Sequence, residues 1–206
     1  MGVRSSLLAA ACALLPMVAP AAGETVPCAA LKTGAWFRYA KTDVYDRTTE
    51  HLAKIESIDG DRMRGTNEEG LPVVTDMSWN PYSVGERKAD PKYYRIPECP
   101  FSLGETRVYR DVDYDAWAPG ARERGTFTVT VDPEFVSLSV KGGSFKVVRV
   151  VAELAYRTRW NSVGKARTES FYAPEIGAVV KKEFHEATPL RETRNRYELL
   201  EYSLSK

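Results

Sequence analysis

The side chains that could build a metal or catalytic site are few in this sequence. His185 and Glu186 begin like the helical motif of zinc proteases, but that motif needs a second histidine where the chain has Pro189. His51 is the only other histidine, so a zinc site would need carboxylates from elsewhere in the chain. We therefore expect His185 and Glu186 to be polar residues at the end of a strand.

Three aspartates at alternate positions could bind a cation. Asp111, Asp113 and Asp115 would share one face of a strand, and calcium prefers several carboxylate oxygens. A standard EF-hand loop does not fit, because Ala116 and Arg122 stand where that loop needs glycine and glutamate. We interpret the aspartates as a charged strand edge that discourages pairing, with a non-standard calcium site as the alternative.

The sequence contains no recognisable motif for a nucleophile or a cofactor. A Gly-x-Ser-x-Gly elbow is absent, and any catalytic triad would depend on one of two histidines. Phosphate loops and dinucleotide fingerprints are absent too, so we expect no cofactor. Glycoside cleavage by a pair of carboxylates is an alternative that the sequence leaves open, because its 28 acidic residues offer many pairs of unknown spacing. We expect a protein that is not an enzyme, and a hydrolase is the distant alternative.

The first 22 residues are typical of a secretory signal peptide. Arg4 precedes a largely apolar run over residues 7–18, and small residues suited to cleavage follow. A membrane span needs about 20 apolar residues, and prolines interrupt this run, so we expect no stable span. We predict removal of residues 1–22, a single domain over residues 23–206, and a periplasmic or secreted location.

Removal of the signal would leave a neutral chain with two cysteines. The sequence has 29 basic and 28 acidic residues, and Arg4 is the one charge in residues 1–22, which leaves 28 of each. A neutral chain has no long-range electrostatic field that would attract nucleic acid, so we expect no nucleic-acid partner. Cys28 and Cys99 would be the remaining thiols in an oxidising compartment, so we expect them to form a disulfide; two free thiols are the alternative.

Alternating apolar and polar residues predict strands over much of the chain. Residues 125–131 and 134–140 both alternate, and we interpret Asp132-Pro133 between them as a turn. Residues 145–160 also fit a helix, but their β-branched content favours one long strand. In residues 195–204, apolar side chains stand at alternate positions, which favours a strand over a helix.

Turn residues separate these segments. Pro174 and Gly177 suit a turn over residues 173–177, because proline fixes one torsion and glycine permits a positive φ. Residues 80–100 contain four prolines and are expected to form an irregular loop joined to Cys99. The pattern predicts an all-β single domain, an antiparallel meander that forms a curved sheet or half-barrel.

Three segments resemble elements of an uncharacterised family of bacterial secreted domains. They are "CPFSLGETRVYR" (99–110), "VKGGSFKVVRV" (140–150) and "ESFYAPEIGAVVKKEF" (169–184). The family pattern is Phe-Pro-Leu-x-x-Gly-x-x-Trp, then Ala-Gly-Thr-Phe, then Trp-Tyr-Ala-Pro-x-x-Gly, and this chain departs from it at Arg107 and Phe171. The resemblance implies a fold similar in outline to the half-barrels of periplasmic lipoprotein carriers.

Aromatic side chains are spread along the whole sequence. They could fill the core of a curved sheet, or line an apolar concave face that holds a ligand. We expect an exported binding protein for an apolar small molecule, lipid or lipidated partner; the alternative is an envelope assembly factor that contacts other proteins. The predicted contact residues lie on two neighbouring strands: Val150, Leu154, Tyr156, Trp160, Phe171 and Tyr172.

Overall fold

The computed structural model describes residues 23–88, 96–113, 124–157, 163–188 and 191–205. The expected signal peptide, Asp115 and Trp160 lie outside these ranges. The described residues form strands and connecting segments, and they include no helix that could cross a membrane. The all-β prediction is therefore confirmed.

Fourteen strands are present in the described part of the chain. They are β1 (Thr25–Val26), β2 (Trp36–Thr42), β3 (Thr48–Asp59), β4 (Arg62–Thr66), β5 (Pro72–Asp76), β6 (Pro81–Val84), β7 (Arg87–Lys88), β8 (Phe101–Ser102), β9 (Thr106–Asp113), β10 (Arg124–Val140), β11 (Gly143–Arg157), β12 (Val163–Ala173), β13 (Ala178–Thr188) and β14 (Arg191–Ser203).

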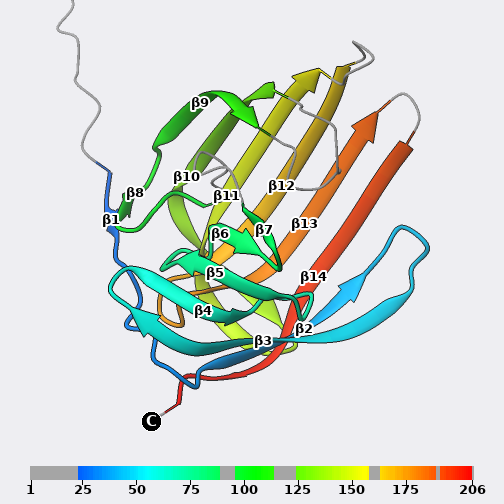
Figure 1. Cartoon of the computed structure of the whole chain (residues 1–206). Coiled ribbons are helices and arrows are strands. Elements are labelled where there is room, and N and C mark those ends of the chain that lie inside the picture. Colours follow the sequence, from blue (N-terminus) through cyan, green and yellow to red (C-terminus); the bar gives the residue numbers. More distant parts are fainter. Residues whose placement is uncertain (1–22, 89–95, 114–123, 158–162, 189–190, 206) are drawn as a thin grey trace, which may run out of the picture.

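Twelve of these strands form one antiparallel sheet that is open at both ends. Its order is β7-β6-β5-β4-β3-β2-β14-β13-β12-β11-β10-β9, and β1 pairs with β8 separately. Figure 1 shows β9 to β14 as long neighbouring strands, with β2 to β4 across their lower ends and β6 and β7 in front of them. The sheet thus curves until its β5–β7 end faces the long strands, as expected for a curved meander.

Two local predictions were wrong, and proline chemistry explains both. Asp132-Pro133 is no turn, because β10 runs through it with an irregularity between Val131 and Phe135. Proline cannot donate to a ladder, and a bulge accommodates it where pairing with β9 has ended at Thr130. Residues 80–100 contain two short strands, the first of which starts with Pro81, a position where proline is tolerated.

The other local predictions are confirmed. The segment expected to form one long strand is β11, and the C-terminal segment is β14. Between β12 and β13 the chain turns, with Gly177 at a φ of 63° and its N–H donated to the Ala173 carbonyl at 2.9 Å. Glycine adopts this torsion without steric cost.

Two apolar clusters fill the interior. The first lies on the inward-facing side of β9 to β12 and is covered by Val26, Phe101 and Ile96. The second joins Phe37 on β2 and Ile55 on β3 to residues of β11, β13 and β14. Burial of these side chains removes apolar surface from water, which is the main favourable contribution to folding.

The expected disulfide is present and joins the N-terminal segment to the segment before β8. Cys28 and Cys99 are separated by 71 residues in the sequence and by 5.1 Å between their Cα atoms. The cross-link therefore holds β1 and the Ile96–Cys99 segment beside the first apolar cluster.

Replacing both cysteines with alanine is expected to lower the free energy of unfolding by about 3 kcal/mol, because a long loop is released in the unfolded chain. Urea unfolding of the oxidised protein and the double variant measures the difference. Reductant should destabilise the natural sequence and leave the variant unchanged; equal stability of the two oxidised proteins would contradict a stabilising role.

Candidate functional site

The residues predicted as ligand contacts lie mainly inside the first apolar cluster. Val150, Leu154 and Tyr156 on β11 and Tyr172 on β12 are buried and pack in this cluster. Phe171, one position earlier, is partly buried and packs against the second cluster. The structure thus brings four of the six residues to one side of the sheet, and their contact with a ligand stays a prediction.

The residues considered for a metal or catalytic site lie on strands. His185 is exposed, and its Nε2 lies 2.8 Å from Glu192 Oε1, while Glu186 Oε1 accepts a hydrogen bond from Tyr156 at 2.9 Å. Among the described residues, no cluster of three histidine, cysteine or acidic side chains could hold a metal. Asp111 has a φ of 56° at an irregularity between β9 and β10, so the strict alternation assumed for the aspartates is interrupted there.

A cavity lies between the long strands and the part of the sheet that curves over them. Its volume is about 80 Å³, and it is partly open to solvent. The apolar part of its wall includes Tyr39, Val73, Trp79, Val84, Ile96 and Val179. The polar part includes Glu68, Thr75, Ser78, Asn80, Ser170 and Lys182.

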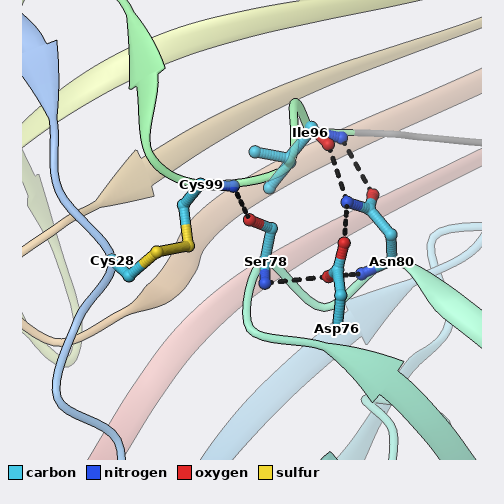
Figure 2. The surroundings of a disulfide bond; sticks show 6 residues. All are labelled: Cys28, Asp76, Ser78, Asn80, Ile96 and Cys99. Atoms are coloured by element: carbon cyan, nitrogen blue, oxygen red, sulfur yellow. Dashed lines mark hydrogen bonds between the residues drawn. A yellow bond between two sulfur atoms is a disulfide. The ribbon is translucent and has the colours of Figure 1, made fainter. Parts of the chain in front are cut away.

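A polar turn between β5 and β6 forms one wall of this cavity, and Figure 2 shows the hydrogen bonds among its residues Asp76, Ser78 and Asn80. Asp76 Oδ1 accepts hydrogen bonds from the Ser78 and Asn80 N–H groups, each at 2.8 Å, and Oδ2 accepts one from Asn80 Nδ2 at 2.9 Å. Burial raises the pKa of the Asp76 carboxyl, although these donors oppose the shift. The turn is therefore organised around one buried acid.

The same turn is bonded to the segment that carries the disulfide. Asn80 Nδ2 donates to the Ile96 carbonyl at 2.8 Å, and Ile96 N–H donates to Asn80 Oδ1 at 3.2 Å. Ser78 Oγ accepts a hydrogen bond from Cys99 N–H at 2.9 Å, as Figure 2 shows. Cys28 thus holds the cavity wall indirectly, through its disulfide with Cys99.

Trp79 fastens the turn to the long strands. Its Nε1 donates to the Gly177 carbonyl at 2.8 Å, and its ring meets Phe37 edge-on at 5.7 Å between centroids. The backbone φ of Trp79 is 64°, a left-handed conformation that is costly for a bulky residue. These contacts hold the strained turn in place over the sheet.

Charged side chains form matched pairs at the cavity wall and directly behind it, where Lys41 and Glu69 do not line the cavity themselves. Lys182 is bonded to Glu68 and lies 4.0 Å from the centre of the Tyr197 ring. The Tyr197 hydroxyl donates to Glu69 Oε1 at 2.8 Å, and Lys41 Nζ lies 2.9 Å from the same oxygen. Each of the two lysines therefore faces a carboxylate.

Sequence reasoning missed this cavity because its two walls are about a hundred residues apart. The β5–β6 turn spans residues 77–80, and only Asn80 belongs to the segment expected to be an irregular loop. The available signal was on β12, where Thr168 and Ser170 occupy the same buried face as Tyr172. Polar residues at inward positions of a strand indicate either a hydrogen-bonded network or a polar ligand.

Comparisons with known proteins find only distant likenesses to solved structures. No family model and no curated protein matches the chain. A predicted lipoprotein from Parabacteroides distasonis is 11% identical, with a TM-score of 0.44 over 87% of this chain and 100% of that one. The hypothetical lipoprotein YmcC from Escherichia coli is 8% identical, with a TM-score of 0.43 over 82% and 84%.

A predicted exported protein from Bacteroides fragilis, described as having a YmcC-like fold, is 10% identical. Its TM-score is 0.40 over 88% of this chain and 99% of that one. At this level of similarity, the three likenesses carry no information about a ligand or an activity.

Glu69 is expected to make stability depend on pH. Burial alone would raise the pKa of its carboxyl, but hydrogen bonds from Lys41 and Tyr197 outweigh burial and lower the pKa. A lowered native pKa contributes stability at neutral pH that is lost as the pH falls below the ordinary value of 4.5. Glu69→Gln should therefore cost about 1 kcal/mol at pH 7, and the difference should shrink below pH 4.5.

Urea unfolding of both proteins from pH 7 to pH 3 measures this effect. Glu134→Gln, at an exposed position of β10, is the matched control and should change little. A Glu69→Gln difference that stays constant over the whole pH range would contradict the assignment.

Proposed function

We propose that this chain is an exported binding protein that works without catalysis, and that the cavity receives the apolar part of a small ligand. The cavity itself supports the proposal, since it joins aromatic and aliphatic walls to a small number of polar groups. The pattern of residues 1–22 and the disulfide support export.

The charged groups of the wall suit binding better than proton transfer. Lys182 and Glu68 are bonded to each other, and Lys182 also lies over an aromatic ring. A general acid or base needs a pKa tuned toward the working pH and a path to the substrate. A matched ion pair instead forms a fixed polar boundary beside the apolar wall.

The volume of the cavity limits what can enter it. One buried water occupies about 10–15 Å³ of such a cavity. The space of about 80 Å³ therefore suits about six non-hydrogen atoms. Ligands of that size reach dissociation constants of roughly micromolar to millimolar. Because the cavity is partly open, a longer molecule could insert one end and extend outward.

None of the five described contact residues lines this cavity, but two of them lie close to its wall residue Ser170. Val150 on β11 is the register partner of Ser170, which belongs to the cavity wall. Tyr172 follows two positions later on the same buried face.

Three hexyl compounds, 1-hexanol, hexanoate and hexylammonium, provide probes of the right size. We expect at least one to shift the indole N–H signal of Trp79 in an NMR titration, because that side chain lines the cavity. Ala53→Phe should weaken binding at least tenfold by filling the space from β3, where Ala53 is buried.

Ala155→Phe, the same change at an exposed position of β11, is the matched control and should bind normally. If Ala53→Phe fails to fold, Val84→Phe at the partly exposed rim fills the cavity instead. Absence of binding by all three probes, or equal binding by filled and control variants, would overturn the proposal.

A further inference from the structure

Two buried hydroxyl groups, one on each wall of the cavity, have no hydrogen-bond partner among the described residues. Thr75 on β5 is 3% exposed and Ser170 on β12 is 0% exposed, and both line the cavity. Buried polar atoms are almost always bonded, so these two are available to a group inside the cavity.

The backbone explains why these hydroxyls lie in the interior. Inward positions of β12 alternate, and Ser170 shares its face with Thr168 and Tyr172. Thr75 immediately precedes Asp76, the acid that organises the β5–β6 turn. Ser170 is paired in register with neighbours on both sides, and Thr75 is paired with Met63 beside an irregularity in the β5–β6 ladder, so strand pairing positions both residues.

A third hydroxyl belongs to the same region. The Tyr172 oxygen is buried and also lacks a partner among the described residues. Burial, assisted by the charge of Asp76, raises the pKa of Tyr172 to about 12, so this hydroxyl stays protonated at neutral pH. Tyr172 shares the buried face of β12 with Ser170, although it does not line the cavity itself.

The charges around the hydroxyls disfavour an ionised ligand. Lys182 pairs with Ser170 in register and is bonded to Glu68, so an anion would compete with that carboxylate. A cation would meet Lys182 itself. Asp76 is already the acceptor of three hydrogen bonds from its own turn. Moving an ion into this site without a matched partner is costly.

We propose that the Thr75 and Ser170 hydroxyls bind the uncharged, hydrogen-bonding head group of a short amphiphile, such as an alcohol, ester or amide. This inference rests on the proposed function and names the ligand class of the same cavity. The apolar part of the ligand contacts Val73, Trp79 and Val179, while its head group bonds both hydroxyls. Hydroxyls both donate and accept, so they match such a head group in either role.

The three hexyl probes test the charge preference directly. In the natural sequence, 1-hexanol is expected to bind at least tenfold more tightly than hexanoate or hexylammonium at pH 7. Equal or tighter binding of either ion would overturn the inference while leaving the proposed function intact. Absence of binding by every probe would overturn both.

Two near-isosteric substitutions test the hydroxyls. Thr75→Val and Ser170→Ala should each weaken 1-hexanol binding three- to tenfold, since each removes one neutral hydrogen bond. Thr126→Val and Ser137→Ala, at exposed positions of β10, are the matched controls and should bind normally. Unchanged hexanol affinity in both cavity variants would overturn the inference, whatever their effect on stability.

Thermal unfolding without ligand separates a binding role from a structural one. Removing a buried hydroxyl that has no protein partner should leave the melting temperature unchanged or raise it. A structural hydroxyl would instead lower the melting temperature when removed. Weaker binding together with an unchanged or raised melting temperature is the expected result, and a lowered melting temperature in both cavity variants would count against the assignment.

Discussion

The contact between the β5–β6 turn and the long strands is the constraint on which the rest of this structure depends. An open sheet of twelve strands has no closing ladder among its described residues, so side chains must hold its curved end in place. Trp79 bonds to the Gly177 carbonyl, and Asn80 bonds to both polar atoms of the Ile96 backbone. These bonds create the space between the two walls, because they hold a polar turn above an apolar sheet.

Polar groups around this space fall into two kinds. Asp76 and the pairs that involve Lys182 and Lys41 are satisfied by neighbouring protein groups. They stabilise the wall and contribute little that a ligand could use. The hydroxyls of Thr75 and Ser170 differ, because the described residues provide them with no partner. This contrast between satisfied charges and unsatisfied neutral groups is the physical basis for a neutral head group.

Much of the fold could be predicted from local pattern. The pattern over residues 145–160 led to a long strand, which is correct as far as Arg157, where the described segment ends, and Pro174 with Gly177 led to the correct turn. The Asp132-Pro133 pair misled the same reasoning, because proline signals a turn locally but a bulge when the partner strand continues past it. Pairing along a neighbouring strand is a non-local fact, so residue types alone do not determine it.

For the site, the sequence by itself determined which residues are inward-facing and that Cys28 could pair with Cys99. Only the tertiary structure decided that Thr75 and Ser170 share one cavity, and that the described contact residues predicted from the sequence do not line it. The physical reason is that alternation specifies the face of each strand, whereas the curvature of the whole sheet specifies which faces meet. That curvature arises from the twist of many strands and from side-chain contacts between segments about a hundred residues apart.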